Sequence, residues 1–270
     1  MKTIKNIKTV IGDNIANINK ILRLSWYELI AQNNDATLGF LWNFITPALQ
    51  IFVYWFVFAV GLKTRKPIDG HPFIIWLMVG IYPWLFISSS ILAGSKAIIS
   101  YSTIIKRMQF PMSIVPTKAV TTCLINHLFS IAIMIAILLL GGYGLDFCAI
   151  GIIYYLLCSL VLILGIAFLF SAIAVVSKDF LNILPSIIRL FFYMTPILWP
   201  STNLEGNLRL IVELNPFNYI IEGYRQSLLG KSFSVAVSLY DVYFWVVAVT
   251  IFVIGIDVHM KFKNKFADLI

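Results

Sequence analysis

Long stretches without any charged residue constrain this chain more than any other feature of its sequence. Residues 36–62, 72–95, 119–145 and 147–177 contain no Asp, Glu, Lys or Arg. Each stretch is long enough to cross a bilayer as a helix, which takes about 20 residues. A helix pairs its own backbone amides, and these Leu-, Ile- and Phe-rich runs lack the alternating polar pattern of a membrane barrel. The sequence therefore predicts an all-α membrane protein.

Two further segments are apolar apart from one charge each. Residues 180–200 contain only Arg189, and residues 235–256 contain only Asp241. Counting both, we predict six transmembrane helices, at about 39–62, 72–92, 113–140, 148–176, 180–200 and 235–258. They form one transmembrane domain over residues 36–260, between tails at 1–35 and 261–270. The composition agrees, because 60% of the residues are hydrophobic and only 12% are charged, against about 25% charged in soluble proteins.

The distribution of basic residues predicts that both termini are cytoplasmic. The first 24 residues carry five Lys or Arg and no apolar run typical of a signal peptide. With both ends inside, 13 of the 20 basic residues are cytoplasmic and six are external, as the positive-inside rule favours. The external loop with Lys63, Arg65 and Lys66 is an exception. The net charge of +8 is thus explained by topology, and we expect no nucleic-acid partner.

Apolar residues recur at three- and four-residue steps over residues 14–34, with Lys20, Arg23 and Glu28 between them. This spacing predicts an amphipathic helix on the cytoplasmic membrane surface, with Trp26 and Tyr27 suited to the headgroup zone. Such a helix is either a membrane anchor or a contact for a partner protein.

Proline and glycine interrupt the pattern from Thr195 to Ser234. Between them lie two apolar stretches, Leu208–Leu214 and Phe217–Leu229, each too short to span a bilayer. We predict two half-helices, either dipping into the outer leaflet or lying on it, with their polar backbone ends covered by protein or water.

The chain shows little of the chemistry that an enzyme needs. Its three histidines are not spaced with other ligands as a metal site would be, and its cysteines Cys123, Cys148 and Cys158 are typical of apolar packing. Gly230-Lys231-Ser232 resembles the end of a phosphate-binding loop, but the glycine required five residues earlier is Arg225. Any ATP site would therefore belong to a separate subunit.

Polar side chains inside the predicted spans need a reason to be there. Arg189 should face a bundle interior, a water-filled path or a carboxylate, unless it extends to the membrane surface. His127, next to Asn126, is more typical of an interhelical hydrogen bond than of a proton relay. The aromatic residues, 15% of the chain, suit interfacial belts and lipid-facing packing, and also a channel that slides sugars past stacking faces.

Several short motifs follow one another along the chain: Leu38–Trp42 with Pro47, Gly80–Trp84, Lys106–Pro111, Lys178-Asp179, Thr195–Ile197, Leu214–Phe217 and Tyr224-Arg225. Their order resembles that in the type-2 ABC exporter permeases that move polysaccharides and teichoic acids. They cover nearly the whole chain in the family's order. Nothing in them separates teichoic acid from O-antigen or capsule substrates.

The resemblance implies a permease in a bacterial plasma membrane, not an enzyme, that works as a homodimer with two ATPase subunits. The ATPases would bind ATP and Mg²⁺, and this chain would need no cofactor or metal. The substrate would be a polymer on an undecaprenyl diphosphate carrier. Contact with the ATPases is expected from the N-terminal amphipathic helix and the 94–110 loop, with Glu28, Lys96, Tyr101, Lys106, Arg107 and Phe110 as candidates.

Two other groups of candidates follow from the same expectation. Along the substrate path we place Lys20, Arg23, Trp42, Tyr54, Trp55, Arg189, Phe192 and Tyr193. At the exit we place Pro196, Asn215, Pro216, Tyr224 and Arg225. Two alternatives stay open: an ABC exporter of small hydrophobic molecules or lipids, and a membrane-embedded enzyme that acts on lipid intermediates, against which the lack of clustered titratable groups argues.

Overall fold

The structure is a computed structural model that describes residues 2–32, 37–61, 67–102, 111–143, 147–201, 204–230 and 238–263. Within these ranges every regular element is helical, which confirms the predicted all-α class. The longer helices are α3 (Trp42–Trp55, continued by a π-helical segment, Phe56–Gly61), α4 (Phe73–Ser100), α6 (Val115–Leu140), α7 (Gly151–Val176) and α11 (Leu239–Phe262). The shorter helices are α1 (Lys2–Ala16), α2 (Ile18–Ala31), α8 (Asp179–Met194), α9 (Gly206–Glu213) and α10 (Pro216–Leu229).

Five helices in the described ranges are long and apolar enough to cross a membrane: Trp42–Gly61, Phe73–Ser100, Met112–Leu140, Gly151–Val176 and Leu239–Phe262. They match five of the six predicted spans. The remaining one, 180–200, corresponds to α8, which has only 16 residues. At about 1.5 Å per residue α8 is roughly 24 Å long, short of the roughly 30 Å of a bilayer core. The helix stops because Thr195 is extended (φ −85°, ψ 138°), the conformation favoured before a proline.

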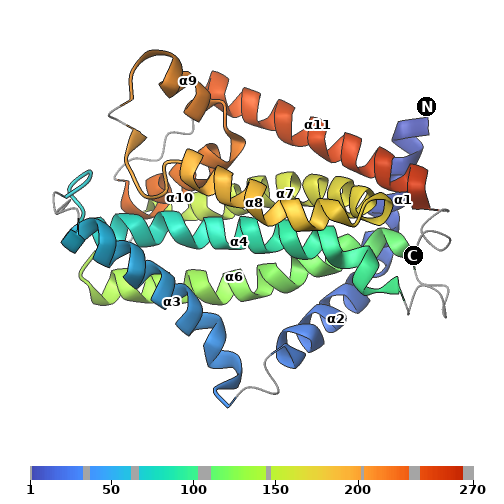
Figure 1. Ribbon diagram of the computed structural model, residues 1–270, viewed down its shortest axis with the longest axis horizontal. Helices are drawn as coiled ribbons and strands as arrows, with labels where there is room; N and C mark the ends of the chain where they lie inside the picture. Colours follow the sequence, from blue (N-terminus) through green and yellow to red (C-terminus); the bar gives the residue numbers. More distant parts are fainter. Residues whose placement is uncertain are drawn as a thin grey trace.

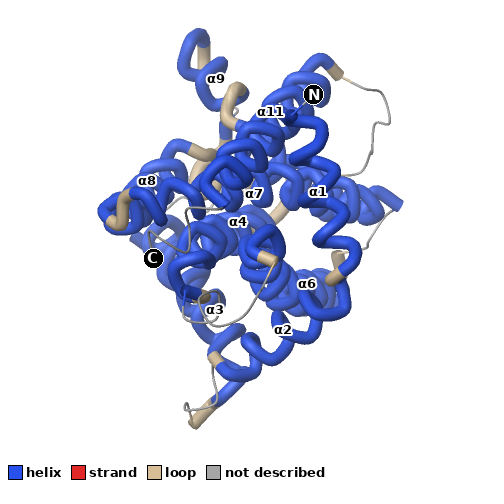
Figure 2. Tube along the Cα trace, turned by 90° about the vertical axis from the view of Figure 1, so that its right-hand side faces the viewer, coloured by secondary structure: helices blue, strands red, loops and turns tan. Residues whose placement is uncertain are grey.

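The helices form a bundle with α4 and α7 at its centre, as the end-on view in Figure 2 shows. Most residues of α4 and α7 are buried, whereas α3, α6 and α11 expose much of their surface. In Figure 1, α1, α2 and the end of α11 lie at one end of the bundle, called the terminal end below. The opposite end holds α9, α10 and residues 67–72, and is called the loop end.

Small residues bring the central helices close together. A Cβ added at Gly255 of α11 would collide with the carbonyl oxygen of Gly165 on α7, and one added at Gly165 would lie 2.7 Å from the Cα of Phe252. One added at Gly94 of α4 would lie 2.6 Å from the Cβ of Ala167. Close approach over small residues is typical of helix pairs in membranes. Gly165 and Ala167 therefore pack against other helices of this chain.

The N-terminal region contains two helices where the sequence predicts one over residues 14–34. The chain turns at Asn17, between α1 and α2. Helix α1 packs beside α11, where the Asn6 amide donates to Asp257 (2.8 Å). The prediction left the residues before 14 as part of a cytoplasmic tail, whereas Val10 is buried in a small core with Phe168 and Ile256.

Helix α2 uses its apolar residues on two faces. Ile21, Ser25 and Leu29 are buried against α6, and the Ser25 hydroxyl donates to the carbonyl of Lys118 (3.0 Å). Leu22 and Trp26 stay exposed, as a helix at a membrane surface requires. The predicted helical pattern thus serves protein packing as well as an exposed face.

We expect Gly255→Leu to destabilise the bundle, because the new side chain would push α11 away from α7. Overpacking of this kind typically costs about 1–3 kcal/mol. Thermal unfolding of the purified chain in detergent measures the effect. The matched control is Gly12→Leu on α1, where an added Cβ meets nothing within 4 Å. Equal melting temperatures for the two variants would contradict this account of the packing.

Candidate functional site

Two polar stripes run along helices that are otherwise apolar. On α3 the stripe is Asn43, Thr46, Gln50 and Tyr54; on α8 it is Asn182, Ser186, Arg189 and Tyr193. Steps of three and four residues put each set on one face of its helix. All four side chains of the α8 stripe are exposed. Polar side chains are rare on lipid-facing surfaces, so these faces are suited to water or a polar ligand.

The two stripes approach one another toward the loop end, where aromatic rings fill the gap. The ring centroids of Tyr54 and Phe192 are 5.4 Å apart, and those of Trp84 and Phe192 are 5.8 Å apart. Tyr54 lies within electrostatic reach of Arg189 and Tyr193. In the other direction α3 diverges from the bundle (Figure 1). Four predicted path residues are thereby brought together at one point.

Arg189 is exposed on α8 and forms no ion pair within the described ranges. Of the roles that the sequence leaves open for it, a carboxylate partner is not found there. The exposed position on the polar stripe fits a water-filled path or an extended, surface-seeking side chain.

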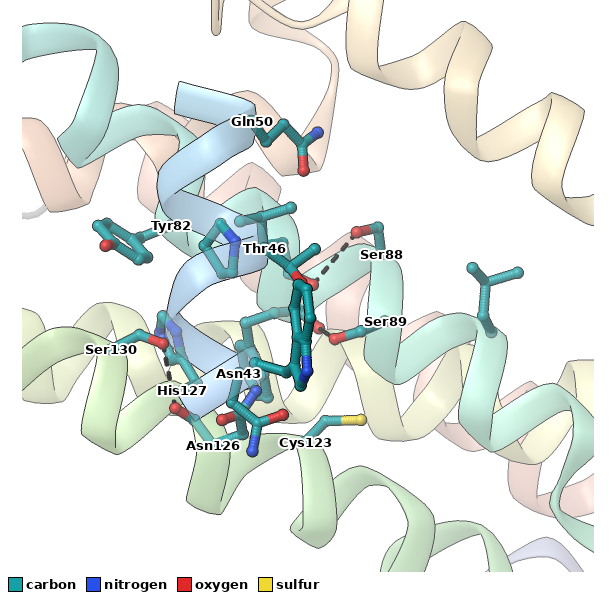
Figure 3. A pocket seen from close by; sticks show the side chains of 15 residues that line it. Asn43, Thr46, Gln50, Tyr82, Ser88, Ser89, Cys123, Asn126, His127 and Ser130 are labelled. Carbon is teal, nitrogen blue, oxygen red and sulfur yellow. Dashed lines mark hydrogen bonds between the residues drawn. The ribbon is translucent and has the colours of Figure 1, made fainter. Parts of the chain in front are cut away.

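A pocket of about 410 Å³ lies between α3, α4 and α6, within the range of about 300–1,000 Å³ typical of small-molecule sites. Figure 3 shows that α3 contributes Asn43, Thr46 and Gln50. Helix α4 contributes Tyr82, Ser88 and Ser89, and α6 contributes Cys123, Asn126, His127 and Ser130. Trp42 also lines the pocket. The α3 stripe therefore forms a wall of this pocket.

His127 connects the pocket to α10. Its ring stacks on Phe86 with centroids 4.5 Å apart and planes 5° apart. Its Nε2 atom and the hydroxyl of Tyr224 share a hydrogen bond of 3.1 Å. The predicted interhelical hydrogen bond of His127 is confirmed, and its partner is a residue that the sequence placed at the exit.

The predicted exit residues form a buried clamp at the loop end. The Arg225 guanidinium donates to the carbonyls of Pro196 (2.7 Å) and Ile197 (3.0 Å) and to the Glu222 carboxylate (2.6 Å). The guanidinium also stacks over the Trp76 ring, and its Cζ atom lies 3.5 Å from the ring centroid. A Cβ at Gly80 would collide with it, so glycine at this position makes room for the cation.

The Arg225 guanidinium stays charged, because an arginine side chain keeps its proton in proteins and these acceptors surround it.

Asn215 ties the start of α10 to the same turn. Its side-chain oxygen accepts from the Phe217 amide (3.0 Å), which caps α10, and its amide nitrogen donates to the Thr195 hydroxyl (2.8 Å). Pro216 occupies the first turn of α10, where its missing N–H removes no hydrogen bond. α9 and α10 lie where the sequence predicts two half-helices.

α10 reaches deep into the bundle. Phe217 contacts Trp84 edge-on at 5.7 Å, while the Leu229 carbonyl lies 3.0 Å from His71 Nε2. Trp84 is roughly 16 Å along α4 from its first residue, Phe73, at about 1.5 Å per residue. α10 therefore spans from the interior to the surface of the loop end.

At the terminal end, Lys118 joins three segments. It pairs with Glu28 of α2, and its Nζ atom lies 4.7 Å from the centroid of the Tyr101 ring. The Thr122 hydroxyl donates to the same carboxylate (3.3 Å). Burial raises the pKa of Tyr101, so its ring stays neutral beneath the cation. Two of the predicted ATPase-contact residues thus meet at a lysine that the sequence did not single out.

The remaining predicted residues are dispersed or outside the described ranges. Lys106, Arg107 and Phe110 lie outside them. Lys96 is exposed on α4, and Lys20 and Arg23 are exposed on α2, away from the aromatic contact of Tyr54. Trp55 packs against Phe52 with centroids 6.0 Å apart.

Sequence reasoning missed the neutral polar residues of the pocket. The recurrence of Asn43, Thr46, Gln50 and Tyr54 within a charge-free span was a usable signal. No comparable sequence signal marks Ser88, Ser89 and Asn126, since single small polar residues are common in membrane helices.

Comparison with known proteins decides the family. Residues 19–229 match the ABC-2 type transporter family. The chain belongs to that family. The O-antigen export system permease protein RfbA of Myxococcus xanthus is 29% identical over 207 residues, 76% of this chain and 78% of that protein. Two proteins of the same name from Klebsiella pneumoniae are 24% identical over 251 residues, 90% of this chain and 92% of theirs.

We expect Arg225→Met to destabilise this ABC-2 protein strongly. The substitution leaves the Glu222 carboxylate and two carbonyls without their donor, and breaking a buried pair typically costs about 3–5 kcal/mol. Arg209→Met is the matched control, because Arg209 forms an exposed pair with Glu213 on α9 and such pairs are worth about 0–1 kcal/mol. Thermal unfolding in detergent compares the two. If Arg225→Met lowers the melting temperature no more than the control does, the contacts of Arg225 do not stabilise the fold as described.

Proposed function

We propose that this chain is the membrane subunit of an ATP-driven exporter of a cell-surface polysaccharide. Family membership supports the transporter role, and the relatives are named for O-antigen export. The observation that carries the proposal is the polar face of α3 and α8 beside an aromatic contact, on a bundle that is otherwise apolar. A sugar chain needs hydrogen-bonding partners and rings to slide on, and this face offers both.

The proposed assembly is a homodimer with two ATPase subunits, which bind ATP and Mg²⁺ while this chain carries out no catalysis. Two copies would place their polar faces opposite each other around one path. The substrate is a polymer on an undecaprenyl diphosphate carrier, of the O-antigen kind or a related polymer such as teichoic acid. Exposed Lys20 and Arg23 on α2 suit the diphosphate, because cations favour phosphate groups at the cytoplasmic face.

In the proposed topology the terminal end is cytoplasmic and the loop end external. α8 together with the turn at Thr195 and the α9–α10 pair completes a sixth crossing. The segment 94–110 and α2 contact the ATPases. The cluster of Lys118, Glu28 and Tyr101 supports this, because it fixes both segments to the first turns of α6.

Deletion of the gene in its native host tests the function. We expect surface polysaccharide to disappear and lipid-linked polymer to accumulate inside, with both restored by the wild-type chain. A tagged chain should bring an ATPase with it on purification. Unchanged surface polysaccharide together with altered resistance to hydrophobic compounds would instead support an exporter of small hydrophobic molecules.

Arg189→Gln should slow export without loss of the folded protein. The exposed cation lies on the proposed path, and a hydrogen bond to a charged group is worth about 1.5–3 kcal/mol, or roughly tenfold or more in rate. Arg189→Lys should retain more export, and Arg209→Gln on α9 serves as the control. Surface polymer formed per unit time after induction is the measurement, and full export by Arg189→Gln would remove this residue from the path.

A further inference from the structure

The pocket between α3, α4 and α6 has an unusual lining for a site among apolar helices. Amides from Asn43, Gln50 and Asn126 and hydroxyls from Thr46, Ser88, Ser89 and Ser130 face it. No Asp, Glu, Lys or Arg is among its lining residues, all of which are described. The pocket is thus rich in neutral donors and acceptors and poor in charge.

The hydroxyls of Ser88, Ser89 and Ser130 donate to backbone carbonyls of their own helices, but the Asn126 side chain still needs a hydrogen-bonding partner. The side-chain oxygen of Asn126 is buried and has no partner within the described ranges. An unsatisfied buried polar group costs about 1–3 kcal/mol, and hydrocarbon from lipid cannot satisfy it. Water, or an occupant that carries hydroxyl groups or similar neutral polar atoms, can donate to this oxygen.

Aromatic rings add apolar, stacking surfaces to the polar lining of the pocket. Trp42 and Tyr82 line the pocket together with the amides, and His127 is held against Phe86 with its Nε2 atom used by Tyr224. Amides bind pairs of hydroxyl groups, and an indole face packs on the apolar face of a sugar ring while its N–H stays available for hydrogen bonding. A diphosphate would need cations, which the lining does not provide.

We propose that this pocket binds an uncharged sugar segment of the exported polymer, separately from the carrier diphosphate. The proposal rests on the proposed function for the identity of the polymer. The site is distinct from the α8 side of the polar face, since α8 contributes no residue to its lining. By holding sugar beside α3, it retains the chain while the carrier is still at the cytoplasmic surface.

The first test measures sugar binding without relying on export. A single reporter cysteine, Ser89→Cys, is made in a chain whose three native cysteines are replaced, and the whole complex is placed in lipid nanodiscs. Ser89 is exposed and lines the pocket. We expect maltose, a neutral sugar, to slow maleimide labelling several-fold, and its carboxylate analogue maltobionate to have little effect. Leu239→Cys, fully accessible at the start of α11 (91% exposed), should be labelled equally with and without sugar.

The second test removes the hydrogen-bonding groups. Gln50→Leu with Asn126→Leu keeps side-chain size but removes both amides. We expect protection by maltose to be lost and export to fall about tenfold, while the melting temperature changes little, because the Asn126 oxygen has no hydrogen-bond partner in the protein to lose. Asn207→Leu, exposed on α9, should leave protection and export unchanged.

Three outcomes would overturn the proposal: no protection by maltose, equal protection by maltobionate, or equal protection by the detergent lauryldimethylamine oxide, which would identify a site for an acyl chain. Full export and protection in the double variant would also overturn it. Failure of the proposed function is seen separately, as unchanged surface polysaccharide in the deletion strain.

Discussion

A polar group among apolar helices must be hydrogen-bonded by the protein or reach water or a ligand, and this requirement organises the whole structure. Arg225, His127 and Lys118 meet it through protein partners. Each of the three is almost fully buried and each joins helices that are distant in sequence. The stripe on α8 meets the requirement through exposure. In the pocket beside α3, only some of the polar groups are hydrogen-bonded by the protein. This difference distinguishes surfaces suited to binding from contacts that hold the fold.

The structural contacts form a continuous chain from the pocket to the loop end. His127 lines the pocket and bonds to Tyr224, and the next residue, Arg225, holds the carbonyls of Pro196 and Ile197. That turn is where α8 ends. An occupant that moves His127 would therefore act on Tyr224, and through α10 on the turn that closes the far end of the polar face. This is a physical connection in one conformation; coupling between the two sites requires a second arrangement of the same contacts.

Much of the fold followed from the sequence because its strongest signal, the absence of charge over 20 or more residues, depends on no tertiary contact. The α9–α10 pair was predicted for a similar reason, since proline and glycine set local helix limits. The sixth span was not confirmed, because Thr195-Pro196 ends α8 early. The sequence singled out the motifs at Thr195–Ile197 and Tyr224-Arg225, but it did not predict that they contact each other. That Arg225 would hold Pro196, 29 residues away, depends on how α10 folds back into the bundle, and no local pattern contains that information.

α3 is the helix whose packing best suits movement. Most of its side chains are exposed or half-buried, Pro47 removes one of its internal hydrogen bonds, and it ends in a π-helical segment at Phe56–Gly61. Such segments are frequent at functional sites. The same helix carries one polar stripe, forms a wall of the pocket, and contributes Tyr54 to the aromatic contact with Phe192. A displacement of α3 would therefore change the pocket, the polar face and its aromatic closure together, whereas the tightly packed α4, α7 and α11 could stay in place.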